Sequence, residues 1–82
     1  MVVTVKFFAS LRELAGIDEC RMTLAPGASA AETKRLLAAQ YPGLERFFSS
    51  TRLALNWEYQ PWDVPVQEGD ELALIPPVSG GA

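Results

Sequence analysis

Apolar and polar residues alternate along four stretches of the chain, which is the pattern of β-strands with one buried face. In the first stretch, Val3, Val5 and Phe7 fall on one face, and Phe8 falls on the other. The four stretches with this alternation are residues 2–8, 18–25, 52–56 and 71–75. We therefore expect four strands that share one core.

The later strands supply the other apolar residues of that core. The residues predicted to point inward are Cys20, Met22, Leu24, Leu53, Leu55, Leu72 and Leu74. Ile75 falls on the opposite face, as Phe8 does. Residues 56–59 are expected to turn the chain, and Pro61 and Pro65 restrict the following segment to an edge strand or irregular structure.

Two Ser and Glu pairs, each separated by three positions, predict the starts of two helices. Ser10 with Glu13 should begin a short helix that ends at Gly16. Ser29 with Glu32 should begin a longer helix. These pairs are the spacing of a capping box, in which both side chains bond the first backbone N–H groups.

The longer helix should pack on the sheet through one face. Leu36, Leu37 and Tyr41 lie on that face, whereas Lys34 and Arg35 are expected to be solvated. A Pro-Gly dipeptide then ends the helix, and the short aromatic segment after it should form a helical turn over the core edge.

The order of elements predicts an α+β domain. One main helix crossing a mixed sheet of four to five strands, with both terminal strands central, is the β-grasp or ubiquitin-like arrangement. A ferredoxin-like arrangement would need a second long helix, which the sequence does not predict. We expect a single domain over residues 1–75 and a flexible C-terminal tail over residues 76–82.

Composition and charge limit the functions that the domain can have. The 82 residues are 49% hydrophobic and 21% charged, as in one small globular domain. The net charge of -3 has no basic run, so neither nucleic acid nor an anionic membrane is an expected partner. Without an apolar stretch of about 20 residues or a signal-peptide pattern, we expect a cytoplasmic protein.

The side chains offer little for catalysis or metal binding. Cys20 is the single cysteine and the chain has no histidine, so neither a disulfide, a zinc site nor a His-activated nucleophile is expected. Cys20 itself alternates with core residues and is predicted to be one of them. A stand-alone enzyme is therefore disfavoured.

The C-terminal segment reads Pro76-Pro77-Val78-Ser79-Gly80-Gly81-Ala82. Prolines prevent a helix, and glycines lack the Cβ that would block a narrow channel, so the tail should be slim and extended. Such a tail suits insertion into a partner and chemistry at its carboxylate. The alternative is an ordinary frayed terminus.

Three segments together resemble the small, sulfur-carrying subunits of molybdopterin synthase, in the MoaD/ThiS family of ubiquitin-like sulfur carriers. The segments are Phe7-Phe8-Ala9-Ser10-Leu11-Arg12-Glu13-Leu14-Ala15-Gly16, Val66-Gln67-Glu68-Gly69-Asp70-Glu71-Leu72-Ala73-Leu74 and Ile75-Pro76-Pro77-Val78-Ser79-Gly80-Gly81. Thiazole-forming sulfur carriers share the diglycine end, but they are shorter and usually lack the first segment. They remain an alternative, as does a ubiquitin-like interaction module without covalent chemistry.

The resemblance implies a function for Gly81. An ATP-dependent enzyme would adenylate its carboxylate, which would become a thiocarboxylate and donate sulfur to cyclic pyranopterin monophosphate, forming the molybdopterin dithiolene. The implied partners are this adenylating enzyme and the large synthase subunit, in a heterotetramer. The small subunit would be non-catalytic and bind no cofactor, and ATP would serve the activating enzyme only.

The resemblance also gives a meaning to apolar residues that the core does not use. Phe8, Tyr59 and Ile75 are expected to form an exposed interface beside the base of the tail. The chain departs from the family at Ala82, which follows the diglycine. Either a protease removes Ala82, or the chain was cut from a longer fusion, or this copy is not activated as its relatives are. Because Val78-Ser79-Gly80-Gly81 is otherwise intact, we expect removal before Gly81 can react.

Overall fold

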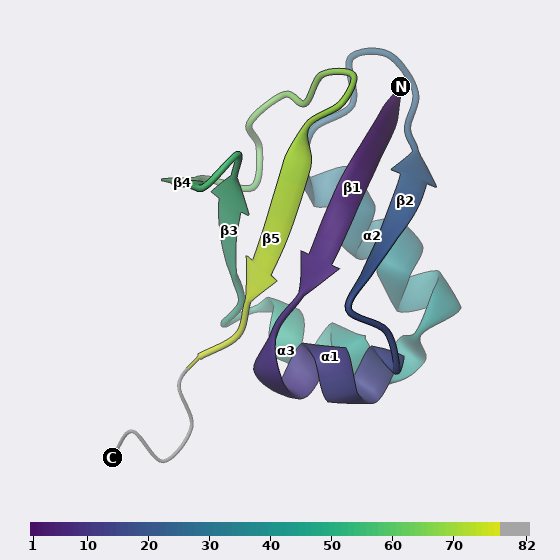
Figure 1. Cartoon of the computed structure of the whole chain (residues 1–82), viewed down its shortest axis with the longest axis vertical. Helices are drawn as coiled ribbons and strands as arrows, with labels where there is room; N and C mark the ends of the chain where they lie inside the picture. The colour runs from purple at the N-terminus through teal and green to yellow at the C-terminus, as the bar shows by residue number, and fades with distance from the viewer. Residues whose placement is uncertain (78–82) are drawn as a thin grey trace.

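The computed structural model describes residues 1–77, and the secondary structure in this range follows the predicted order (Figure 1). The strands are β1 (Val2–Phe7), β2 (Glu19–Thr23), β3 (Arg52–Leu55), β4 (Glu58–Gln60) and β5 (Glu71–Ile75). The helices are α1 (Ala9–Ala15), α2 (Ala31–Gln40), the 3-10 turn η1 (Pro42–Leu44) and α3 (Glu45–Phe48). The helical turn expected after the long helix is thus confirmed.

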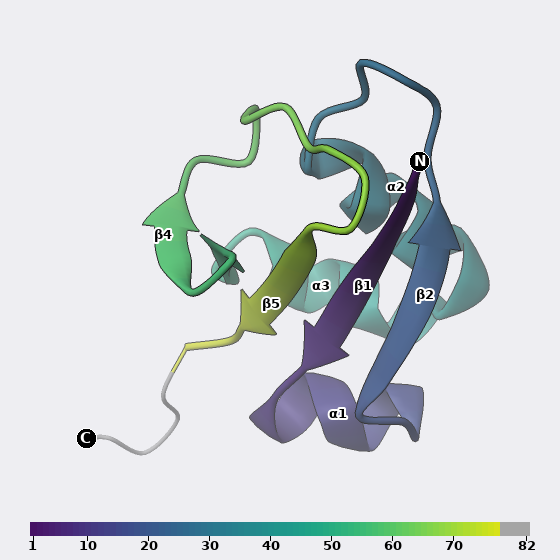
Figure 2. The ribbon, with the colours of Figure 1, turned by 45° about the horizontal axis from the view of Figure 1, so that its top comes forward.

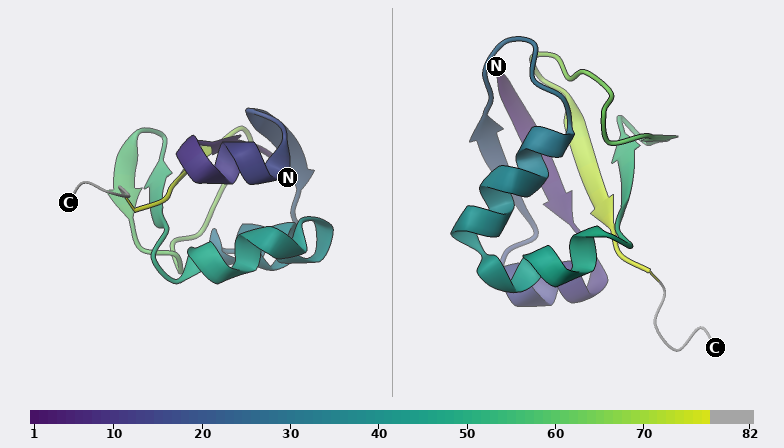
Figure 3. Two further views of the ribbon diagram at one scale, coloured as in Figure 1. Left: turned by 90° about the horizontal axis from the view of Figure 1, so that it is seen from below. Right: turned by 180° about the vertical axis from the view of Figure 1, so that it is seen from behind.

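The strands form one five-stranded mixed sheet in the order β2-β1-β5-β3-β4 (Figures 1 and 2). β1 and β5 pair in parallel, and every other neighbouring pair is antiparallel. The two terminal strands of the domain are therefore central, and α2 crosses one face of the sheet while α1 and α3 lie at one end of it (Figure 3). This arrangement confirms the predicted β-grasp fold.

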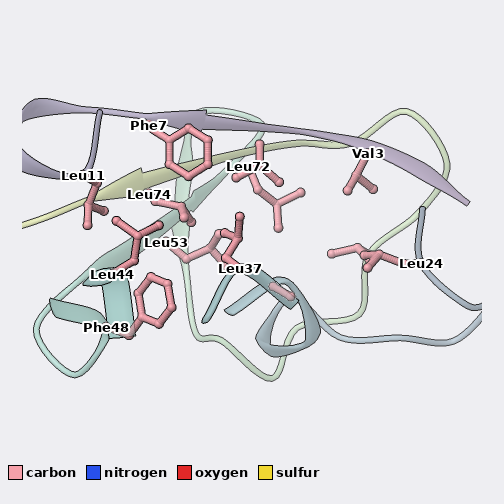
Figure 4. Close-up of a cluster of buried hydrophobic side chains, with 13 residues drawn as sticks. Val3, Phe7, Leu11, Leu24, Leu37, Leu44, Phe48, Leu53, Leu72 and Leu74 are labelled. Atoms are coloured by element: carbon pink, nitrogen blue, oxygen red, sulfur yellow. The ribbon is translucent and has the colours of Figure 1, made fainter. Parts of the chain in front are cut away.

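The core lies between the sheet and α2, and the strand alternation predicted its composition. Val3, Val5 and Phe7 are buried, and Leu72 and Leu74 pair beside them in parallel register (Figure 4). The core cluster also contains Leu11, Leu24, Ala30, Leu37, Leu44, Phe48, Leu53 and Val66. Partly buried residues that pack against this cluster include Cys20, Met22, Leu36, Tyr41 and Leu55.

Neither predicted capping box forms. α1 begins after Phe8, whose carbonyl accepts from the backbone N–H of Leu11 at 3.1 Å, and Ser10 lies inside the helix. α2 begins at Ala31, and its start has no side-chain cap within residues 1–77. The N–H groups of Ala30 and Ala31 donate to the carbonyls of Val64 and Trp62. The N–H of Glu32, from which the Ser29 hydroxyl would accept in a capping box, donates to the Ser29 carbonyl, so the hydroxyl is not required.

The charged residues of α2 differ in their surroundings. Glu32, which was expected to cap the helix, pairs with the exposed Arg35 instead. Lys34 is half-buried, and its Nζ lies 4.4 Å from the centre of the Trp62 ring. The prediction of a solvated side chain is therefore wrong for Lys34, because the segment after β4 covers this side of the helix.

Within residues 1–77, no helix has both the length and the apolar character needed to cross a membrane. The predicted division into a domain over residues 1–75 and a tail over residues 76–82 stays a prediction, since the segment 78–82 lies outside the described residues.

Candidate functional site

β5 leads directly to the C-terminal segment. It is hydrogen-bonded on one side to β1 and on the other to β3, where Ile75 lies opposite Arg52. The side chain of Pro76 is buried and that of Pro77 is exposed. The base of the segment is therefore held by the centre of the sheet.

The proposed reactive residue and its neighbours lie beyond this base. Gly81, with Val78, Ser79 and Gly80, falls outside the described residues, so the assignment of chemistry to Gly81 stays a prediction. The same holds for the removal of Ala82.

The residues predicted as an interface lie on the sheet face that α2 does not cover. Phe7 pairs with Leu74, so Phe8, which follows β1, and Ile75, the last residue of β5, lie at the same end of the two central strands. Phe8 is exposed and Ile75 is half-buried. Tyr59 lies further along the sheet, opposite Ala54, and is 57% exposed. The role of these residues as an interface stays a prediction.

Arg52 lies between the two parts of this predicted interface. It is paired with Ile75 across the β3–β5 ladder, and its guanidinium carbon lies 4.4 Å from the centre of the Tyr59 ring. The three predicted residues are thus separated by a cation rather than joined in one apolar patch. No pattern in the sequence indicated that Arg52 belongs to this interface.

Two alanines in the middle of this uncovered face are nevertheless buried. Ala73 is 3% exposed and Ala54 is 6% exposed, and they are cross-strand partners. The same row continues to Lys6 on one side and Tyr59 on the other. Since alanine cannot bury itself, the longer side chains around the pair must cover it.

Lys6 is held above this face by two contacts. Its Nζ forms an ion pair with Glu71 Oε2 at 2.6 Å and lies 5.3 Å from the centre of the Trp57 ring. The hydrogen bond to Glu71 raises the pKa of Lys6. Arg52, in contrast, forms no ion pair with any residue that the structure describes.

A surface hollow of about 410 Å³ lies beside Arg52. It is lined by residues at the start of β3, in β4 and directly after β4, namely Thr51, Arg52, Leu53, Tyr59, Gln60, Pro61 and Trp62. The Trp62 indole N–H donates to the Thr51 carbonyl at 3.1 Å, which fixes one wall of this hollow.

Candidate metal ligands and nucleophiles are few among the described residues. In the part of the chain that the structure describes, no group of three acidic or thiol side chains is arranged to hold a metal ion. Burial raises the pKa of the Cys20 thiol, with a smaller contribution from Glu19, which lowers its reactivity as a nucleophile. Cys20 is half-buried and packs against the core.

Residues 5–81 match the ThiS family. A molybdopterin synthase sulfur carrier subunit from Chlamydomonas reinhardtii is 39% identical over 83 residues, which cover 99% of this chain and 100% of that protein. The match to the family extends from within β1 to the diglycine. It therefore includes all three segments that resemble the sulfur carriers.

Two solved structures have the same fold over nearly the whole chain. SAMP1 from Haloferax volcanii is 32% identical with a TM-score of 0.89, and the match covers 99% of this chain and 100% of that one. A protein-protein complex of subunits 1 and 2 of the molybdopterin-converting factor from Helicobacter pylori includes a chain that is 27% identical, with a TM-score of 0.71 and coverage of 99% and 100%. The sequence match and the shared β-grasp fold together show that the chain belongs to the ThiS family.

Proposed function

We propose that the chain is the sulfur-carrier subunit of a molybdopterin synthase and that sulfur is carried as a thiocarboxylate on Gly81. The observation that supports this most directly is the full-length match to relatives named sulfur carrier subunits, in a chain whose central strand β5 leads to Ser79-Gly80-Gly81. A carrier needs its reactive end fixed at the base and accessible beyond it.

The chemistry requires no side chain of this protein. A carboxylate oxygen of Gly81 attacks the α-phosphorus of ATP, and pyrophosphate leaves. A sulfur nucleophile at the oxidation level of hydrosulfide then attacks the acyl carbon and displaces AMP, giving a thiocarboxylate. This anion is the nucleophile that transfers sulfur to cyclic pyranopterin monophosphate, and water regenerates the carboxylate. Two such transfers build the dithiolene.

Two partners follow from this sequence of steps. An adenylating enzyme supplies the ATP chemistry, and the large synthase subunit receives the tail and binds the pterin substrate. The Helicobacter pylori complex of subunits 1 and 2 supports the second partner. We propose a heterotetramer of two small and two large subunits, in which this chain is the non-catalytic donor and holds no cofactor of its own.

Ala82 has to be removed before the first step. The carbonyl carbon of Gly81 is bonded to the nitrogen of Ala82, so Gly81 has no free carboxylate until this peptide bond is hydrolysed. We therefore propose proteolytic processing between Gly81 and Ala82. Intact-mass analysis of active protein from its own host should show a chain ending at Gly81, and active material that retains Ala82 would contradict the proposal.

Incubation of the Gly81-terminated protein with ATP, the adenylating enzyme and a sulfur source should raise its mass by about 16 Da, the difference between sulfur and oxygen. High-resolution mass spectrometry would measure the gain. The matched control is the chain that retains Ala82, which should not change. If neither form gains mass with a demonstrably active adenylating enzyme, the carrier function is wrong.

Protein modification is a second candidate function. The chain is also similar to small archaeal modifier protein 1 from Haloferax volcanii, with 30% identity and a TM-score of 0.85. An acyl adenylate on Gly81 can also react with a lysine amine, which would form an isopeptide bond. Peptides from the host proteome in which Gly81 is linked to a lysine side chain would support this function. If no such peptides are found, the carrier function is the one that remains.

A further inference from the structure

The turn between β3 and β4 holds a large aromatic residue in an unfavourable conformation. Leu55 pairs with Glu58, so Asn56 and Trp57 form a two-residue hairpin loop. Their φ angles are 50° and 70°, and positive values at both positions are the mark of a type I′ turn. This turn prefers Asn followed by Gly, whereas a bulky residue at the second position is disfavoured.

Burial does not compensate for this conformation. Trp57 is 70% exposed, which is unusual for the largest side chain of a small domain. A strained conformation that the packing of the domain does not require is a reason to look for a role in binding.

Trp57 belongs to a group that we call the aromatic–cation surface, which consists of Lys6, Arg52, Trp57 and Tyr59. Lys6 lies against the Trp57 ring and Arg52 against the Tyr59 ring. Trp, Tyr and Arg are the residues that contribute most often to the affinity of protein interfaces. Figures 1 and 2 both show the β3–β4 hairpin on the same side of the molecule as the end of β5.

The charges of this surface indicate what it binds. Glu71 neutralises Lys6, whereas Arg52 has no carboxylate partner among the residues that the structure describes. An acidic group on another protein could pair with the edge of the Arg52 guanidinium, while the flat face of the guanidinium stays on the Tyr59 ring.

The position of Arg52 also connects this contact with the C-terminal segment. Arg52 lies opposite Ile75, and Ile75 is the last residue of β5 before the C-terminal segment. A partner that binds the C-terminal segment therefore also comes close to Arg52, which lies beside the last residue of β5.

On the basis of the function proposed above, we propose that the aromatic–cation surface docks an acidic patch of the large synthase subunit. Trp57 supplies the apolar contact, and Arg52 supplies the ion pair that selects this partner. The surface extends the predicted interface of Phe8, Tyr59 and Ile75 towards the hairpin.

Trp57→Gly is the critical variant, because it replaces the strained residue with the one that the turn prefers. We expect its urea midpoint to equal or exceed that of the unchanged protein, while its Kd for the purified large subunit rises at least about tenfold. Isothermal titration calorimetry would measure the Kd. If the variant binds more weakly and is equally stable, the weaker binding results from the lost contact and not from unfolding.

Arg52→Glu should weaken binding by at least about tenfold, and Arg52→Lys should weaken it less. Arg21→Glu is the matched control, since Arg21 is exposed on the same sheet face in the distant edge strand β2. It makes the same change in net charge and should alter the Kd less than about twofold.

Three results would overturn the inference. These are a folded Trp57→Gly variant with unchanged Kd, equal effects of Arg52→Glu and Arg21→Glu, or a dimer of this chain that dissociates in Trp57→Gly. The mass gain on Gly81 is measured without the large subunit. Failure of that gain counts against the carrier function, whereas failure of the variants counts against this surface alone.

Discussion

A chain shortened by its last three residues, Gly80 to Ala82, should lose sulfur transfer and retain binding to the large subunit. The thiocarboxylate is the nucleophile of the proposed reaction, and removing a nucleophile lowers rates by roughly three or more orders of magnitude. The folded surface that we propose for docking is unchanged, so the Kd should rise by no more than about tenfold. Molybdopterin formation and calorimetric titration would measure the two quantities.

The matched control for this deletion is a chain that lacks Ala82 only. It ends at Gly81 and should transfer sulfur once it has been activated. A non-covalent interaction module would behave differently, because it would lose no function in either shortened chain. Equal activity of the two shortened chains would therefore contradict the carrier function.

The deletion and Trp57→Gly should produce opposite losses. The deleted chain should bind and not transfer sulfur, whereas Trp57→Gly should accept the thiocarboxylate and bind poorly. This comparison distinguishes the reactive end from the surface that positions it. A single defect common to both variants would instead point to a shared loss of folding.

The strands of this fold were predictable because their signal is local and repeated. Val3, Val5 and Phe7 face the core, as period-two alternation requires, and Leu72 with Leu74 obeys the same rule. The central position of β1 and β5 followed from the fold class, not from the alternation itself. Periodicity specifies which face of a strand is buried and leaves its neighbours open.

The helix starts were less predictable because a local motif competes with distant partners. The spacing of Ser29 and Glu32 is that of a capping box, but the carbonyls of Val64 and Trp62 accept from the N–H groups of Ala30 and Ala31 at the start of α2. Those carbonyls reach α2 only after the chain has passed through β3 and β4. No short window of sequence contains this information.

The candidate site also has one part that the sequence could predict and one part that it could not. The diglycine segment could be recognised from sequence, since its residue types and order carry the signal. The contact of Arg52 with Tyr59 could not, because it depends on the hairpin register. One local signal was present: Asn56 is followed by Trp57 where a two-residue hairpin favours glycine.

Leu11→Ala should destabilise the domain by about 2–5 kcal/mol, the range for a fully buried leucine. Leu11 is fully buried in the core cluster with Leu44 and Leu74, and α1 contacts η1 and β5, which carry them (Figure 4). A domain of this size has a total stability of roughly 4–12 kcal/mol, so the loss is a large fraction of it. Urea unfolding followed by circular dichroism would measure it.

Leu14→Ala is the control that isolates burial from every other property of α1. It makes the same chemical change one helical turn away, at a residue that is 43% exposed, and should alter stability by no more than about 0.5 kcal/mol. Helix propensity favours alanine equally at both positions, so only the lost core contacts separate the two variants. Equal losses would mean that α1 does not pack against β5 through Leu11. The end of β5, from which the C-terminal segment begins, would then lack the support that a carrier needs.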